Sequence, residues 1–303
     1  MFGINYCKTD CSEILKIGLN LLLDFKGHTI DYLQLNNPHD LEILKTYPKM
    51  ISKLSPIIGN MIENAAVEKI NEYNWTDLCY NIENCKWIRQ DPNFPDALFN
   101  GPIYPTPGIE IKTWFPLSTE ITARFKESVT YFEEDNTYLA LMVWLPENIL
   151  YGKPKIFDIF TCSCQSIAQA RDAHYHDPPS YLIFEPEDTS ARTGNLQQTN
   201  TVGYKFQGEQ NQFEEAVKIV KSWGPNGDLY DPGTEYQNKL KDLKNRFNYR
   251  MDTNYSKLDR IEHEGLEIFK TKINDTKILG HTISDWALMI QKGDIDYKTL
   301  IRE

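Results

Sequence analysis

The stretch Phe-Pro-Asp-Ala-Leu-Phe-Asn-Gly-Pro-Ile-Tyr-Pro-Thr-Pro-Gly-Ile-Glu-Ile-Lys-Thr-Trp-Phe-Pro, residues 94–116, places two short apolar runs on either side of a loop rich in proline and glycine. This pattern predicts a β-hairpin. Residues alternate in polarity around Glu110, so Glu110 and Lys112 share one face of the second strand. Asp96 precedes the first apolar run, and the loop can fold it back beside Glu110. We therefore expect two carboxylates and an ammonium group in one pocket.

This grouping of charges favours metal-assisted chemistry at phosphorus. Mg²⁺ prefers oxygen ligands and is commonly held by one or two carboxylates together with substrate phosphate oxygens. Asp96 and Glu110 are the candidate ligands, and Lys112 is placed to orient or deprotonate the attacking water. The predicted reaction is phosphodiester hydrolysis. The alternative is an ion pair on a solvated strand edge, which is the usual meaning of exposed charges.

Pro95-Asp96 followed by Glu110-Ile111-Lys112 on a strand resembles the signature of the PD-(D/E)xK nuclease superfamily, which includes most type II restriction endonucleases. The triplet by itself has little specificity, but only this one has a Pro-Asp at hairpin distance. The resemblance implies Mg²⁺-dependent cleavage of double-stranded DNA at a short specific sequence, carried out by a homodimer. The same kind of triplet also occurs at residues 24–26, 242–244, 275–277 and 296–298.

A helix before the hairpin offers a third carboxylate. Ser55-Pro56 is typical of a helix start, and the apolar pattern after it continues to Ile70. Gly59 and Glu63 resemble the Gly-x-x-x-Glu of relatives of the mismatch-repair nicking enzyme, in which the glycine lets the helix approach the sheet and the glutamate joins the metal cluster. Glu63 is thus a candidate catalytic residue and metal ligand. Glu68 is the other candidate, and an ordinary exposed helix carboxylate is the alternative.

The remaining periodicity predicts an α/β fold, with a mixed β-sheet flanked by helices and with helical additions at both ends of the chain. We expect a restriction-endonuclease-like core over residues 1–225. Residues 226–303 would form a C-terminal helical segment that serves as a dimer contact or a DNA-backbone arm. Further helices are predicted at residues 12–25, 30–48, 118–128, 163–174, 214–223, 236–250, 258–270 and 282–292, and further strands at 87–89, 137–145, 156–161 and 181–184.

A polar stretch at about residues 187–208 is rich in side chains that read base edges. Arginine and lysine pair with guanine, asparagine and glutamine with adenine, and threonine methyl groups suit thymine. The stretch is also longer than most structureless connections in compact domains. It is either a DNA-recognition loop or a flexible surface excursion. The candidate DNA-binding residues are Arg192, Asn195, Gln197, Gln198, Asn200 and Lys205.

Composition limits the possible classes. The chain has 303 residues, of which 41% are hydrophobic, so it can bury a large core. Its formal net charge of −11 opposes nonspecific binding to DNA, although a local cleft can differ in sign from the whole surface. No leader pattern opens the sequence and no apolar run is long enough to cross a membrane, so we expect a soluble cytoplasmic protein.

The six cysteines lack the paired Cys-x-x-Cys spacing of a zinc site and are expected to be free buried thiols. His174-Tyr175-His176-Asp177 has a spacing that would suit a metal, but a surface turn before two prolines is the alternative. The sequence thus predicts a Mg²⁺-dependent type II restriction endonuclease. Its rivals are a structure-specific repair or recombination nuclease, which shares the site, and a noncatalytic DNA-binding protein.

Overall fold

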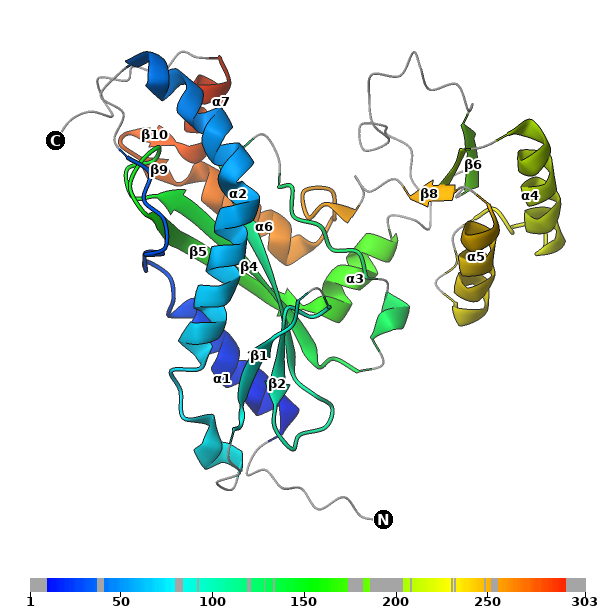
Figure 1. Ribbon diagram of the computed structural model, residues 1–303, viewed down its shortest axis with the longest axis horizontal. Coiled ribbons are helices and arrows are strands. Elements are labelled where there is room, and N and C mark those ends of the chain that lie inside the picture. Colours follow the sequence, from blue (N-terminus) through cyan, green and yellow to red (C-terminus); the bar gives the residue numbers. More distant parts are fainter. Residues whose placement is uncertain are drawn as a thin grey trace. The chain divides into compact units, whose positions relative to one another are not determined.

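The computed structural model describes residues 10–36, 41–79, 84–91, 93–118, 121–127, 129–132, 134–173, 182–185, 204–207, 209–229, 231, 233–247, 249–251 and 256–292. Contacts divide the chain into two units (Figure 1), the first made of residues 1–123, 134–164 and 264–303 and the second of 124–133 and 165–263. This division differs from the expected boundary after residue 225. The reason is that β7 (Tyr204–Gln207) pairs with β8 (Tyr249–Met251) and so joins the two sides of that position.

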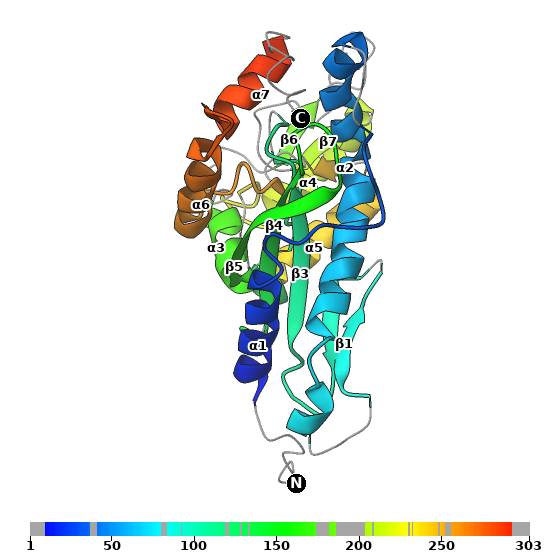
Figure 2. The same cartoon turned by 90° about the vertical axis from the view of Figure 1, so that its left-hand side faces the viewer.

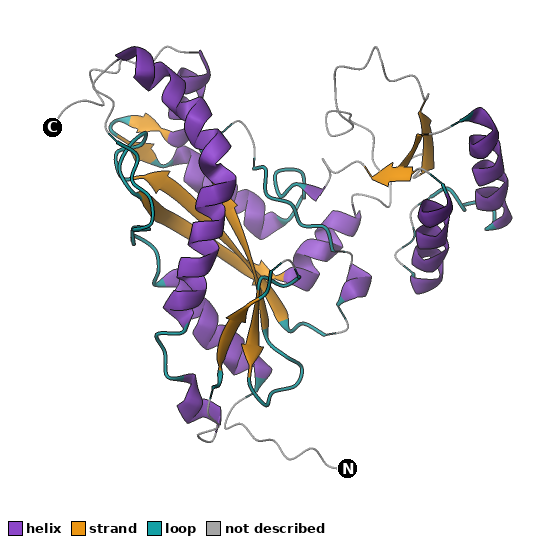
Figure 3. Cartoon of the chain, in the orientation of Figure 1, coloured by secondary structure: helices purple, strands orange, loops and turns teal. Residues whose placement is uncertain are grey.

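A five-stranded mixed sheet forms the centre of the first unit (Figure 3), as the sequence predicted. Its order is β1-β2-β3-β4-β5, and only the pair β3–β4 is parallel. Every residue of β4 from Leu139 to Leu145 is buried, as expected for a strand covered on both faces. The strands are β1 (Lys86–Arg89), β2 (Ala97–Asn100), β3 (Gly108–Trp114), β4 (Thr137–Pro146) and β5 (Pro154–Ser163).

Helices α1 (Cys11–Leu23) and α2 (Leu41–Ile70) cover one face of this sheet (Figure 2). A Cβ atom added to Gly18 of α1 would touch Ile109, and one added to Gly59 of α2 would touch Thr113. Ile109 and Thr113 are four residues apart on β3, so both helices lie against the same face. Asp10 caps α1, since its carboxylate accepts a hydrogen bond from the backbone N–H of Glu13.

Helix α2 corrects two predictions. No separate helix spans 30–48, because Leu35 instead exchanges backbone hydrogen bonds with Gly152, and Ser55-Pro56 lies inside α2 rather than at its start. A proline inside a helix removes one hydrogen bond and disfavours continuation. Here the apolar stripe of α2 outweighs that loss. The stripe repeats every four or seven residues and is fully buried at Ile51, Ile58, Ile62, Ala66 and Ile70.

The helix expected at residues 118–128 is also wrong. Residues 121–127 are not helical, and Arg124 forms an antiparallel bridge with Lys257 instead. The backbone N–H of Phe125 donates to the carbonyl of Ser256, and the side chain of Phe125 is buried. Backbone pairing with residues distant in sequence, together with burial of this aromatic ring, therefore overrides the local helical pattern.

The C-terminal helices of the first unit are α6 (Glu264–Asp275) and α7 (Ile283–Lys292), joined through the short strands β9 (Lys277–Ile278) and β10 (His281–Thr282). The predicted helix at 258–270 is thus displaced, because residues 258–260 form a turn and residues 261–263 are irregular. The ring of Phe269 on α6 packs 5.4 Å from that of Phe160 on β5. Asp158 of β5 also bonds Lys272 of α6, so this helix is fixed to the sheet by both apolar and ionic contacts.

The second unit has its own small sheet and core. Strand β7 lies between β6 (Leu182–Glu185) and β8, parallel to the first and antiparallel to the second. Its helices are α3 (Cys164–Ala173), which starts at the boundary of the two units, α4 (Gln210–Ser222) and α5 (Thr234–Arg246). Short 3-10 helices span Trp75–Cys79 in the first unit and Val129–Tyr131 in the second. The core consists of Phe206, Ala216, Val220, Leu243 and Phe247.

The α/β class with a mixed sheet and flanking helices is confirmed. None of the described helices combines the length and the apolar character that a bilayer-crossing segment requires.

Candidate active site

The hairpin brings Asp96 directly beside Glu110. The backbone N–H of Asp96 donates to Oε2 of Glu110 at 3.1 Å, and the backbone N–H of Ile111 donates to Oδ2 of Asp96 at 2.7 Å. Each carboxylate therefore accepts a hydrogen bond from the neighbouring strand. This reciprocal pair fixes both side chains at the point where β2 and β3 diverge.

Strand pairing explains why Asp96 occupies this position. Strand β2 pairs with β3 only at Ala97↔Ile109 and Leu98↔Gly108. Beyond Ala97 the ladder stops, so the N–H of Ile111 has no backbone partner on that side and bonds the Asp96 carboxylate instead. Gly108 allows the close approach, because a Cβ atom there would lie 2.7 Å from Pro95.

Lys112 completes the predicted trio. Its Nζ contacts Oε1 of Glu110 and lies 3.5 Å from Oδ2 of Asp96. Glu110 and Lys112 project together because they are two residues apart on β3. The geometric expectation from the sequence, two carboxylates and one ammonium group in a common environment, therefore holds.

Burial makes the cluster electrostatically unusual. Glu110 is only 6% exposed, and this burial, together with the charge of Asp96, raises its pKa to about 7 although Lys112 opposes the shift. Burial also disfavours the charged form of Lys112, but Glu110 and Asp96 outweigh it and raise the pKa of the ammonium. The site thus holds its cation firmly while still lacking positive charge to stabilise all of its carboxylates.

Glu63 of α2 belongs to the same electrostatic cluster. Its pKa is raised by burial and by the charge of Asp96, while Arg89 and Lys112 act to lower it. Helix α2 approaches β3 closely at Gly59, one turn before Glu63, where an added Cβ atom would lie 2.8 Å from Oγ1 of Thr113. The glycine therefore has the packing role that the sequence pattern indicated.

Glu68, the other candidate for the third carboxylate, is placed differently. It is exposed and accepts a hydrogen bond from the hydroxyl of Tyr32 at 2.9 Å. The charges of Asp96 and Lys112 act on Glu63, which makes it the better-supported candidate for the third carboxylate.

Arg89 is a member of the cluster that sequence reasoning missed. Its Nη2 donates to Oε2 of Glu63 at 3.1 Å and to Oδ1 of Asn60 at 3.0 Å, while Nη1 lies 3.4 Å from Asp91. Arg89 stands opposite Ala97 in the β1–β2 pairing, which brings it next to Asp96. The sequence predicted a strand at residues 87–89, next to the motif. It did not indicate that α2 packs beside this strand and brings Asn60 and Glu63 to Arg89.

A cleft of about 410 Å³ adjoins the cluster within the first unit. One wall is α2, including Glu63, and the other is the C-terminal half of β3, including Lys112, together with the segment that follows it. A substrate in this cleft would therefore meet the ammonium of Lys112 and the third carboxylate. The described lining residues also include Ser52, Ser55, Thr113, Trp114, Phe115, Ser118 and Thr122.

The donor set suits a hard divalent cation. Asp96 and Glu110 offer carboxylate oxygens on adjoining strands, and the raised pKa of Glu110 marks a buried site that is short of positive charge. In the part of the chain that the structure describes, no three His, Cys, Asp or Glu side chains already converge as a complete ligand set. Asp96 and Glu110 would hold the ion, with Glu63 as the nearest further carboxylate.

Most of the predicted base-reading residues cannot be placed. Arg192, Asn195, Gln197, Gln198 and Asn200 lie outside the described residues, as do His174, Tyr175, His176 and Asp177. Lys205 lies in β7, so the end of the expected loop is a strand. The predicted basic helix at 236–250 ends at Arg246, with Arg250 in β8.

The charges of this basic helix are partly compensated. Lys239 pairs with Glu235 at 2.6 Å, and Arg246 pairs with Glu215 of α4. Each of these two cations thus already has a carboxylate partner, Lys239 within α5 and Arg246 across to α4.

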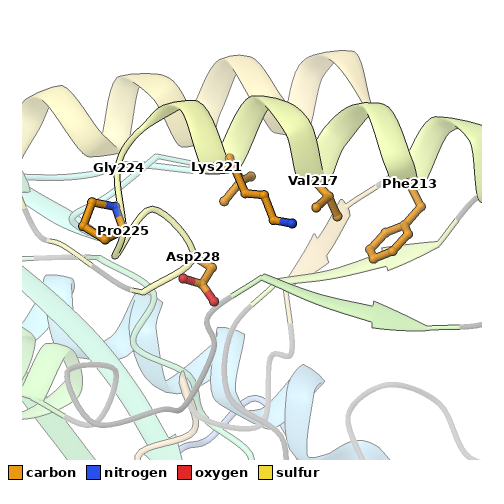
Figure 4. Close-up of a pocket in the computed structure, with 7 residues that line it drawn as sticks. Phe213, Val217, Lys221, Gly224, Pro225 and Asp228 are labelled. Carbon is orange, nitrogen blue, oxygen red and sulfur yellow. The ribbon is translucent and has the colours of Figure 1, made fainter.

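A second cavity, of about 640 Å³, lies in the second unit (Figure 4). Phe213, Val217 and Lys221 project into it from α4, opposite Asp228. Its described lining is otherwise Val220, Gly224 and Pro225, so it offers one acid and one base in apolar surroundings rather than a cluster of titratable groups. None of the predicted catalytic residues lines it.

Five cysteines are described, and all are free thiols: Cys11, Cys79, Cys85, Cys162 and Cys164. Burial raises the pKa of Cys162 to about 12 and that of Cys164 well above its usual value, so neither provides a thiolate near neutral pH. Cys7 lies outside the described residues.

Comparison of the chain with known proteins gives no matching family model, no similar curated protein and no similar solved structure. Arguments about function therefore depend on the cluster itself.

Proposed function

We propose that the chain is a Mg²⁺-dependent nuclease that hydrolyses phosphodiester bonds of DNA at the cluster of Asp96, Glu110, Lys112 and Glu63. The observation that carries the proposal is the contact of one lysine with both carboxylates, because this lysine also lines a cleft. An isolated surface ion pair would be exposed and weakly coupled, whereas this pair is buried with a strongly shifted glutamate.

The residues have distinct roles in this proposal. Asp96 and Glu110 would hold Mg²⁺, and a bound ion would supply a water of lowered pKa and positive charge beside the phosphate. Lys112 orients the attacking water or stabilises the additional negative charge at phosphorus. Arg89 donates a hydrogen bond to Glu63 and opposes the rise in the pKa of this carboxylate that burial and Asp96 cause.

The finer assignment, a type II restriction endonuclease that cuts double-stranded DNA as a homodimer, is also a proposal. It rests on the resemblance of Pro95-Asp96 and Glu110-Ile111-Lys112 to the superfamily signature. A palindromic DNA target has two-fold symmetry and would be matched by a protein dimer with the same symmetry. Digestion of plasmid DNA that yields discrete fragments with fixed ends would support this assignment, whereas cleavage that follows branches or mismatches would favour a structure-specific nuclease.

The direct test is incubation of the purified protein with unmethylated phage DNA, oligonucleotides and Mg²⁺, with and without a chelator. Cleavage that the chelator abolishes supports a metal-dependent nuclease. The absence of metal-dependent cleavage on every DNA tested would refute it, and retained DNA affinity would then indicate a noncatalytic binding protein.

A further inference from the structure

The cleft beside the cluster separates charged groups from neutral ones. Among its described lining residues, Glu63 and Lys112 are the only formally charged side chains, and both belong to the carboxylate cluster. The remainder of the lining is made of hydroxyl groups and apolar surface. A phosphate beyond the cluster would find no cation among these residues, so this part of the cleft suits an uncharged portion of a substrate.

Hydroxyl groups face the cleft from two sides. Ser52 and Ser55 lie on α2, and Thr122 lies on the segment after β3. Because a hydroxyl both donates and accepts, such a lining can bond a sugar or the polar edge of any base. Trp114 and Phe115 supply the apolar part of the lining.

The size of the cleft limits what can enter it. Its volume of about 410 Å³ lies within the roughly 300–1,000 Å³ typical of sites that enclose one small ligand. A base that remains stacked and paired in a duplex cannot enter such a compartment, whereas a base that is unpaired or turned out of the helix can.

We propose, on the basis of the metal-dependent nuclease function proposed above and not of its finer assignment to a restriction endonuclease, that this cleft holds one unpaired nucleoside adjacent to the phosphate that is cut. The enzyme then acts on a strand that is single-stranded, mismatched or locally opened at that position. The chemistry that recognises the nucleoside is hydroxyl bonding and apolar contact, and Lys112 is the cation of the lining that can face the phosphate.

The test uses three labelled oligonucleotide substrates of one sequence, which are a fully paired duplex, the same duplex with a single-nucleotide bulge, and the single strand. Cleavage is measured with Mg²⁺, and binding is measured separately by fluorescence anisotropy with Ca²⁺. We expect the bulged and single-stranded substrates to be cut about tenfold or more faster than the duplex, because the cost of unpairing is already met. Equal or faster cleavage of the paired duplex would overturn the inference.

Variants that fill the cleft give a second readout. Ser52→Phe and Ser55→Phe should each lower the affinity for the bulged substrate in Ca²⁺ by about tenfold and leave the Mn²⁺ affinity of the protein unchanged. Ile57→Phe is the matched control, because Ile57 is an exposed residue of α2 that does not line the cleft. Unchanged affinity in both serine variants, with folding verified by circular dichroism, would refute the nucleoside site.

The two proposals fail in different ways. If cleavage depends on the metal but does not distinguish the substrates, only the nucleoside site is wrong. If no substrate is cut under any condition, the nuclease function is wrong, and the Ca²⁺ binding series still shows whether the cleft prefers unpaired DNA.

Discussion

The backbone N–H of Asp96 donates a hydrogen bond to the carboxylate of Glu110, at 3.1 Å, across two adjoining strands. The bond from the N–H of Ile111 to Asp96 runs in the opposite direction. Two carboxylates are thus held together by main-chain donors rather than by flexible side chains. Hydrogen bonds from main-chain amides to a carboxylate are among the stronger ones in proteins, so the pair is pre-organised before any metal or substrate binds.

Lys112→Met should abolish cleavage while DNA affinity is retained. The ammonium contacts both carboxylates, and general acid–base groups typically contribute about 10²–10⁴-fold to the rate. Cleavage rate constants at saturating Mg²⁺ and binding in Ca²⁺ give the two readouts. Lys86→Met, at an exposed residue of β1, is the control for loss of one positive charge. A Lys112→Met protein that still cuts within tenfold of the wild-type rate would exclude a catalytic role for this lysine.

The hairpin and its motif could be predicted from sequence because both depend on local patterns. Alternation around Glu110 defined the face of the strand, and the proline-rich loop defined the return of the chain. Strand β4 could also be predicted, because a short and nearly continuous apolar run is typical of a strand covered on both faces. The place of Glu63 followed from helical spacing after Gly59, which does not depend on where the helix begins.

What the sequence could not predict depends on contacts between distant segments. Helix α2 continues through Pro56 because its apolar stripe is buried. The free energy of this tertiary packing cannot be judged from the local sequence around the proline. The place of Arg89 in the cluster depends on its contact with Glu63 of α2, a residue 26 positions earlier in the chain. Residues 121–127 leave the helical pattern because this segment pairs with residues more than a hundred positions away, as in the hydrogen bond from the backbone N–H of Phe125 to the carbonyl of Ser256.

Cleavage should increase with pH through about 7 when Mg²⁺ is limiting. The pKa of Glu110 is raised to about 7 by burial and by Asp96, so below that pH a proton competes with the metal for its carboxylate. Saturating Mg²⁺ should shift the acidic limb to lower pH. Rate profiles at two Mg²⁺ concentrations test this, and an acidic limb that does not move with Mg²⁺ would show that Glu110 is not the titrating ligand.

The same shift has a consequence for stability. A pKa raised in the folded state above its ordinary value of 4.5 means that protonated Glu110 favours folding, and that this contribution is lost as pH rises through about 7. Glu110→Gln should therefore have its most favourable effect on stability at pH 8 and its least favourable effect at pH 5. Thermal unfolding of both proteins across this range measures the difference. A constant difference would contradict the assigned pKa.

Arg89→Gln should shift the pH profile of cleavage upward. Arg89 lowers the pKa of Glu63 against burial and the charge of Asp96, so its removal leaves more Glu63 protonated at neutral pH. The Mg²⁺ concentration needed for half-maximal activity should increase as well. Arg89→Lys keeps the charge and should remain closer to wild type, while Asp91→Asn, at the exposed partner of the same guanidinium, should have little effect. An unchanged profile in Arg89→Gln would assign Arg89 a purely structural role.

Gly59→Ala should lower both the stability of the protein and its cleavage activity, although alanine has the higher helix propensity. Alanine favours a helix interior by about 1 kcal/mol over glycine, but the added methyl carbon would lie 2.8 Å from Oγ1 of Thr113. Overpacking of this kind typically costs about 1–3 kcal/mol and would move Glu63, one turn further along α2. Thr113→Ala removes the clashing atom, so the double variant should recover stability. A double-mutant cycle in chemical denaturation that shows no coupling would exclude the close contact.

Asp158→Asn should destabilise the first unit without affecting the chemistry of the site. Asp158 is 8% exposed and accepts hydrogen bonds from Lys272 at 2.6 Å and from the N–H of Ile159 at 3.0 Å, with Lys26 at 3.1 Å. We expect a loss of about 1–3 kcal/mol in the free energy of unfolding at pH 7.

The pH dependence of this loss identifies its cause. Burial alone would raise the pKa of Asp158, but Lys272, the N–H of Ile159 and Lys26 together lower it below 3.8. A lowered pKa in the folded state gives stability that is present above pH 3.8 and disappears as pH falls through the folded value. The difference between wild type and Asp158→Asn should therefore narrow in acid. A difference that persists unchanged at pH 3 would indicate lost packing rather than a lost charge, since the two side chains are nearly equal in size.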